Sequence, residues 1–170
     1  MSLNQEYPVI DGIVPSYADI KCSITPQGAP LIEMVDIKNI SSGSTLEVGE
    51  QVGATGGRVK ARTTGKSKHE ASMTLYFTGF NKLIDGLAQA ALAAGHTRGN
   101  QVVIGVVQFG ITLIWTPPGS SDIFERRLKG CRYMGDKLDA SEGTDAQGVD
   151  VALNPLENVY MRNGKEIVIL

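Results

Sequence analysis

The triplet Gly65-Lys66-Ser67 has the residue types that end a phosphate-binding loop, in which backbone amides and a lysine hold the phosphate groups. The complete pattern G-x-x-x-x-G-K-[ST] needs a glycine at position 60, where this sequence has Lys60. In addition, no apolar strand precedes the triplet and no helix follows at once. A loop with a solvated lysine is therefore favoured over a nucleotide-binding site.

The potential zinc ligands or nucleophiles are the two histidines, His69 and His96, and the two cysteines, Cys22 and Cys131. None of them forms the close C-x₂-C or H-x₃₋₅-H pair that is typical of zinc sites. Composition alone leaves a Ser-His-Asp or Cys-His arrangement open, but the sequence has no nucleophile-elbow motif. We therefore predict no metal site, no cofactor and no enzymatic activity. Both cysteines are expected to be reduced and packed, because nothing else in the sequence suggests secretion.

A basic run between positions 58 and 68 could bind nucleic acid. It lacks aromatic side chains on which bases would stack, which weakens this interpretation. The alternatives that remain are a solvated charged face and a monomeric β-domain that grips nucleic acid through this run. Its basic residues are Arg58, Lys60, Arg62, Lys66 and Lys68.

The basic run belongs to a longer glycine-rich segment, residues 41–67, whose two halves each alternate with a period of two. Alternation interrupted by the glycines of residues 53–57 predicts a long antiparallel hairpin. Its first arm is acidic, with Glu47 and Glu50, and its second arm is basic. Two strands alone bury too little surface to be stable in water, so the hairpin must be completed by its own core or by another subunit.

Composition sets the frame for these elements. A length of 170 residues, with 42% hydrophobic and 20% charged residues, suits one soluble domain spanning residues 1–170. A net charge of −2 argues against a dedicated nucleic-acid binder. The first residues lack the pattern of a signal peptide, and no apolar run is long enough to span a bilayer, so we expect a soluble protein made in a cytoplasm and no membrane partner.

The remaining chain reads mainly as strands. Residues 1–15 form an N-terminal arm, and residues 136–148 form a loop. Asn163-Gly164 predicts a type I′ hairpin turn, because both residues tolerate positive φ. Strands are predicted at residues 16–25, 31–40, 68–77, 101–116, 123–134, 149–153, 159–161 and 167–170.

One helix is predicted over residues 79–94, ending at Gly95. Its apolar face carries Phe80, Leu83, Ile84 and Leu87. Together these elements predict a mainly β fold, a β-sandwich or partial barrel with one flanking α-helix. In the strands next to the helix and after it, the side chains expected to face the core include Phe77, Phe124, Leu128 and Met134.

The segment EASMTLYFTGFNKLIDGLAQA, an alternating strand that runs into an aromatic-x-x-Leu-Ile-Asp-x-Leu helix, resembles the tail tube proteins of bacteriophages. These are related to the tube proteins of contractile injection systems and to the Hcp proteins of type VI secretion. The resemblance covers residues 16–170 and rests on the order of the elements. The glycine-rich hairpin stands where that family carries its long stacking loop, so the resemblance assigns ring stacking to Leu46, Glu47, Glu50, Arg58, Lys60, Arg62 and Lys66.

What the resemblance implies is a structural subunit. Family members join edge to edge into hexameric rings, which stack into a hollow tube, and in phages that tube conducts DNA without binding it specifically. Sheath, baseplate and tape-measure proteins would be further partners. The protein would be made in the cytoplasm of a host bacterium and reside in the virion tail, or in the tube of a secretion or injection system.

Overall fold

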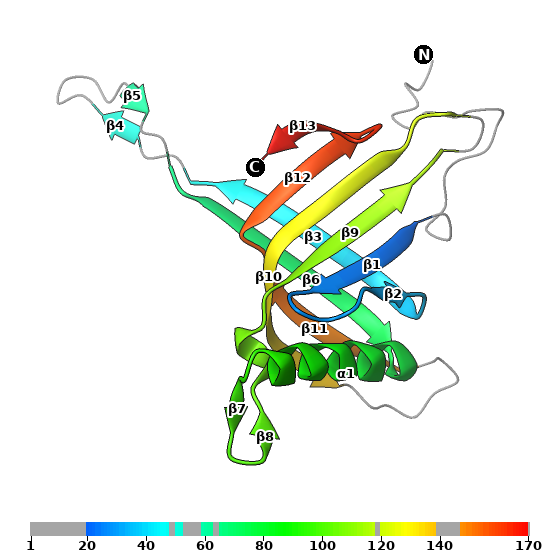
Figure 1. Ribbon diagram of the computed structural model, residues 1–170. Coiled ribbons are helices and arrows are strands. Elements are labelled where there is room, and N and C mark those ends of the chain that lie inside the picture. The colour runs from blue at the N-terminus through cyan, green and yellow to red at the C-terminus, as the bar shows by residue number, and fades with distance from the viewer. Residues whose placement is uncertain are drawn as a thin grey trace.

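The computed structural model describes residues 20–47, 50–52, 59–62, 65–117, 120–138 and 147–169. Within these ranges the chain forms antiparallel strands, one α-helix and one 3₁₀-helix (Figure 1). The predicted mainly β fold with a single flanking helix is confirmed. The elements are β1 (Lys21–Pro26), β2 (Ile32–Met34), β3 (Ile37–Leu46), β4 (Glu50–Val52), β5 (Val59–Arg62), β6 (Ser67–Tyr76), α1 (Phe77–Ala93), β7 (Thr97–Arg98), β8 (Gln101–Val102), η2 (Ile104–Val106), β9 (Phe109–Trp115), β10 (Phe124–Leu138), β11 (Gly148–Asn154), β12 (Glu157–Arg162) and β13 (Lys165–Ile169).

Strand β10 connects the two layers of the fold. Its first half pairs with β9 and β12, and its second half pairs with β11. The first layer is therefore β2-β1-β9-β10-β12-β13, and the second layer is β10-β11-β6-β3. Because β10 belongs to both, the sheet is continuous and folds over on itself, which is the predicted sandwich or partial barrel (Figure 1).

The fold-over occurs at Gly130, which has φ +63°. The register of β10 against β9 shifts between Leu128 and Cys131, as a β-bulge requires. On the neighbouring chain segment, Leu156 donates its backbone N–H to the Lys129 carbonyl at 2.9 Å. A Cβ on Gly130 would lie 2.8 Å from Leu156 Cδ1, so a substitution there would strain the backbone and displace the Leu156 side chain.

Substituting Gly130→Ala is expected to lower the free energy of unfolding by about 2–4 kcal/mol, because it combines left-handed strain with overpacking. Gly28→Ala is a matched control: Gly28 has φ +83° but no neighbouring atom within 4 Å of its Cβ position. It should lose only about 1–2 kcal/mol. Urea denaturation measures both, and equal losses would contradict this account of the bend.

The core lies between the two layers and is closed at one end by α1 (Figure 1). Leu83 and Leu87 of the helix are fully buried, and Phe80 and Ile84 are half-buried. Other fully buried members of this cluster are Ile24, Leu75, Ala90, Ala91, Ile111 and Cys131. Both cysteines are buried and free, as predicted, and desolvation raises the pKa of each thiol to about 12.

The helix ends as predicted and begins earlier than predicted. Gly95, with φ +73°, donates to the Leu92 carbonyl at 3.1 Å, and His96 donates to the Ala91 carbonyl at 2.8 Å, which together form a Schellman motif. At the other end the strand stops at Tyr76, whose N–H bonds to the Asp36 carbonyl. Phe77 is therefore the first helical residue and is 43% exposed, so its predicted place on the buried face of a strand was wrong.

Two predicted strands are in fact broken. Residues 101–116 do not form one strand, because η2 separates β8 from β9. Residues 31–40 are divided between β2 in the first layer and β3 in the second, and the chain crosses between them at Val35-Asp36. In both places the chain changes direction within a segment whose sequence pattern is that of one continuous strand.

Bulges also reverse side-chain faces in β10. Leu128 is buried as predicted and Phe124 is half-buried, but Met134 is 62% exposed. The extra residue at Gly130 exchanges the two faces of the strand, so Cys131 takes the core position and Met134 points outward. The predicted loop at 136–148 is shorter, since β10 continues to Leu138. The turn between β12 and β13 has Asn163 at φ 50° and Gly164 at φ 76°, which confirms the predicted hairpin.

Candidate assembly interface

The glycine-rich hairpin starts deeper in the domain than its sequence suggests. Strands β3 and β6 pair from Ile37–Leu75 to Leu46–Ser67, so the hairpin's base belongs to the second layer. Beyond that pair, the Glu47 N–H donates to the Lys66 carbonyl at 3.0 Å, and β4 and β5 then pair as a short sheet of their own. Figure 1 shows β4 and β5 at the far end of the hairpin, away from both layers.

The predicted stacking residues are distributed along this extension. Leu46 is 62% exposed, and Glu47 and Lys66 are exposed where the hairpin leaves the layers. In the β4–β5 sheet, Glu50 is the register partner of Arg62. The acidic and basic arms thus face one another within one hairpin. Lys60 lies in β5, and Arg58 lies outside the described residues.

The basic run is partly neutralised by its own strand. Lys68 Nζ lies 2.5 Å from Glu70 Oε1, and both side chains are largely exposed. The hydrogen bond with Glu70 raises the pKa of Lys68, and the same bond lowers the pKa of Glu70. A phosphate would have to displace Glu70 from Lys68, which disfavours the nucleic-acid interpretation.

A polar cluster pins the base of the hairpin to the first layer. Ser44 of β3 and His69 of β6 are register partners, and His69 Nδ1 lies 2.9 Å from Ser44 Oγ. Asn158 of β12, which is fully buried, donates from Nδ2 to the same Ser44 oxygen at 3.0 Å. Arg126 of β10 donates from Nε to Asn158 Oδ1 at 2.9 Å. We call these residues the root cluster.

One residue of this cluster stands out in the sequence. His69 stands on the apolar face of a predicted strand, where a polar side chain needs a partner. The residues of the cluster are distant in sequence. Ser44 and Asn158, for example, are 114 residues apart. The structure therefore assigns His69 to a hydrogen-bonded cluster, and the part of the chain that it describes contains no group of three or more possible metal ligands.

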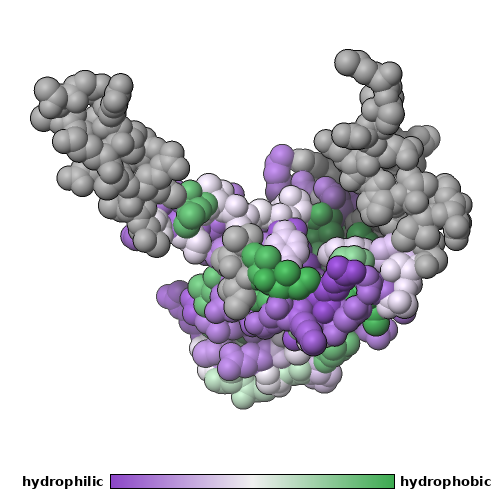
Figure 2. All heavy atoms as spheres, turned by 90° about the horizontal axis from the view of Figure 1, so that it is seen from above, coloured by the Kyte–Doolittle hydropathy of each residue, from purple (hydrophilic) through white to green (hydrophobic). Residues whose placement is uncertain are grey.

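The strand edges differ in how they are covered. The edge strand β2 receives a hydrogen bond at the Glu33 carbonyl from Lys82 Nζ of the helix, at 2.9 Å. Among the described strands, β13 pairs with β12 alone, and its Ile167 and Val168 are 59% and 43% exposed. Beside it lies an apolar groove of about 320 Å³, whose lining includes Trp115, Phe124 and Tyr160. Seen from the top of Figure 1, the surface carries apolar patches between hydrophilic ones (Figure 2).

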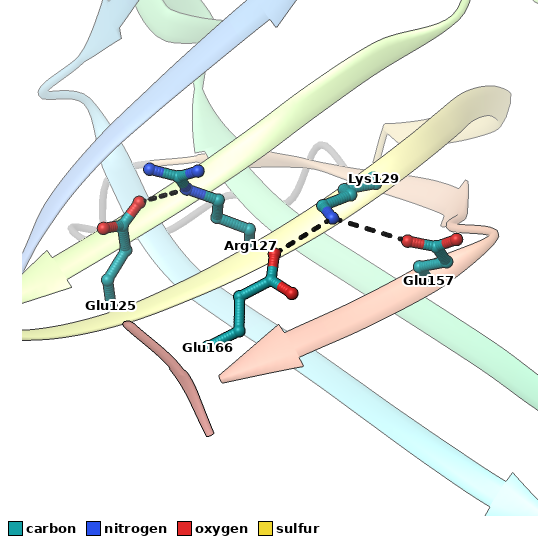
Figure 3. A network of polar contacts seen from close by, with 5 residues as sticks. All are labelled: Glu125, Arg127, Lys129, Glu157 and Glu166. Carbon is teal, nitrogen blue, oxygen red and sulfur yellow. Dashed lines mark hydrogen bonds and ion pairs between the residues drawn. The ribbon is translucent and has the colours of Figure 1, made fainter. Parts of the chain in front are cut away.

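The outer face of the first layer carries charges of both signs (Figure 3). Arg127 pairs with Glu125, and Lys129 Nζ lies 3.6 Å from Glu157 and 3.5 Å from Glu166. Three carboxylates thus offset two bases, so this face does not form a basic patch. Regarding membranes, none of the helices in the described ranges combines the length and apolar character needed to cross one.

Comparisons with known proteins find likeness at the level of structure. No family model matches the sequence, and no curated protein matches it. The fold is similar to a chain in the cryo-EM structure of the anti-feeding prophage baseplate, with TM-score 0.62 and 10% identity over 88% of this chain and 96% of that one.

Two further structures extend this likeness. A chain of the PVC sheath/tube terminator, from an extracellular contractile injection system in the extended state, has TM-score 0.61 and 15% identity and covers 92% of this chain and 99% of that one. The SPP1 tail tube has TM-score 0.56 and 12% identity, with 88% and 79% coverage. At these identities the comparison shows a shared fold, which here includes nearly the whole chain.

Proposed function

We propose that this chain, which has the fold of tail-tube and injection-system tube components, is a structural subunit that assembles into stacked hexameric rings with a central channel. Its proposed role is assembly, and its described residues contain no group of three or more possible metal ligands. The observation that carries this proposal is the hairpin, which leaves the two-layered domain at Leu46 and ends in β4 and β5. A two-stranded ribbon of this kind is marginal in water, so a neighbouring copy would complete it.

Two surfaces suit two kinds of contact. Within a ring, exposed β13 and its apolar groove offer a strand edge for the next copy, and a closed ring leaves no such edge free. Between rings, the hairpin supplies charges of both signs, which would set register more than affinity. Glu50 and Arg62 are backbone register partners within one hairpin, so both signs of charge come from adjacent strands.

The proposed cargo of the channel is DNA, which passes without specific binding. The net charge of −2 is compatible with this, since a strongly basic lumen would hold the polymer through its phosphates. Sheath, baseplate and tape-measure proteins are the proposed further partners. The proposed location is the virion tail, after synthesis in the host bacterial cytoplasm.

Two alternatives remain as proposals. The similar structures include both a tail tube and extracellular contractile injection systems, so an injection-system tube has the same structural support. A monomeric domain that binds nucleic acid through residues 58–68 is the second alternative. The Lys68–Glu70 ion pair counts against it.

Negative-stain electron microscopy of the purified protein, combined with light scattering of the same sample, tests the proposal. We expect rings with six-fold symmetry and stacks of rings that lengthen with protein concentration. A protein that stays monomeric at high concentration would contradict it. Steeply salt-dependent DNA binding by that monomer would instead support the nucleic-acid alternative.

A further inference from the structure

The root cluster lies at the point where the hairpin loses the cover of the first layer. On the same face of β3 and β6 as the core residue Ala71, the register pairs are Ser42–Ala71, then Ser44–His69, then Leu46–Ser67. His69 is 6% exposed, whereas Leu46 is 62% exposed. The pair of Ser44 and His69 is therefore the last pair held beneath the first layer before the hairpin continues alone.

Two hydrogen bonds of the cluster have a fixed direction. Arg126 can only donate, so its Nε–H fixes the Asn158 carbonyl oxygen toward it. The Asn158 amide nitrogen must then donate to Ser44 Oγ, and the third bond joins Ser44 Oγ to His69 Nδ1, with the donor set by the His69 tautomer. Within the described residues no buried side-chain nitrogen or oxygen is left without a partner.

Arg126 is itself held from two further sides. Its guanidinium lies 4.6 Å from the centre of the Tyr160 ring. It also donates to the Ser42 carbonyl of β3 at 3.4 Å. The first layer thus grips β3 at both a side chain and the backbone, two residues apart.

We infer that the root cluster fixes the direction in which the hairpin leaves the domain, and that Ser44, Asn158 and Arg126 are positioning residues for ring stacking. This inference rests on the proposed function. A span of eight residues, the separation of Ser44 and Val52 in sequence, reaches at most roughly 26 Å, so a swing of about 10° at the root displaces the tip by up to roughly 4–5 Å. A displacement of that size exceeds the tolerance of any hydrogen bond or ion pair at the tip. Holding the root fixed also removes an ordering cost from stacking.

Spin labels at Gln51 in β4 and at Gln89 on the exposed side of α1 measure the hairpin's direction through the distance between them. Labelled subunits are diluted into unlabelled protein so that one pair is seen per particle. Ser44→Ala removes the central hydroxyl and should broaden the distance distribution about twofold. The same variant should raise the concentration at which rings stack roughly three- to tenfold, the effect of one lost hydrogen bond.

Three variants make this test specific. Ser44→Thr keeps the hydroxyl and should restore both readouts, and Ser41→Ala alters an exposed serine of the same strand and should change neither. Arg126→Lys keeps the charge but loses the Nε–H donor to Asn158, so it should act like Ser44→Ala even if that variant folds poorly.

The outcomes separate this inference from the proposed function. If Ser44→Ala and Arg126→Lys leave the distances and the stacking at wild-type values while removal of the hairpin abolishes stacking, the root cluster has no positioning role and the proposed function stands. If stacking persists without the hairpin, the proposed role of the hairpin is wrong, and positioning for stacking is overturned with it.

Discussion

Removing residues 46–62 is expected to abolish ring stacking and leave rings of folded subunits. The deletion joins Thr45 to Thr63, so that residues 63–67 form a five-residue loop between the register partners Thr45 and Lys68. Hairpin loops of this length are common, and the core pairs of β3 and β6 are untouched. Stability should therefore change little, while the part of the hairpin that carries β4 and β5 beyond the layers is lost.

Electron microscopy counts stacked against single rings, and thermal unfolding checks the fold. A variant of full length with Glu47, Glu50, Lys60 and Arg62 all changed to Gln separates the hairpin's length from its charge. Stacks of wild-type length in the deletion variant would show that rings meet through another surface.

The second large effect is expected at Leu87, which is fully buried where α1 closes the core. Leu87→Ala should lower the free energy of unfolding by about 2–5 kcal/mol, because it removes buried methyl groups and leaves a cavity. For a domain of ordinary stability this is a large share of the total, so assembly should also fail at physiological temperature.

Leu92→Ala is the matched control. It makes the same substitution in the same helix at a side chain that is 57% exposed, and it should change stability by less than about 0.5 kcal/mol. Guanidinium denaturation gives both values. Similar losses at the two positions would mean that α1 is not held by the face that Leu87 occupies.

Local patterns predicted the elements that depend on local forces. The alternation around Met73 and Leu75, the helical spacing of Leu83 and Leu87, and the Asn163-Gly164 turn all have their causes within a few residues. The hairpin was predicted for the same reason. Its base was placed too late, because β3 continues to pair with β6 through residues whose pattern merges with β2.

The errors arose where tertiary structure decides. The bulge at Gly130 exchanged the faces of β10 and exposed Met134, although the sequence around it alternates normally. Likewise, η2 interrupts an apolar run in which Gly105, next to Ile104, is the one local sign of a break. Apolar runs report burial, and the direction of the chain within the buried region depends on contacts that are distant in sequence.

The candidate interface likewise had some features that the sequence predicts locally and others that depend on tertiary contacts. Charge on the two arms of the hairpin was visible in the sequence, as was the misfit of His69 on an apolar face. The partnership of His69 with Ser44, Asn158 and Arg126 was not, because four different strands supply these residues. The charged hairpin can be recognised from its sequence, but the root cluster that positions it can be recognised only from the folded structure.

The hydrogen bond from Lys82 to the Glu33 carbonyl makes the two flanks of the first layer unequal. A lysine bound to β2 discourages a further strand from adding there, while β13 has no second partner among the described strands. Free subunits should consequently aggregate slowly through contacts between identical sheet edges. In the proposed ring, subunits should add in one direction only. A subunit that stays unassembled in the cell for some time would benefit from having only one of these two edges available for pairing.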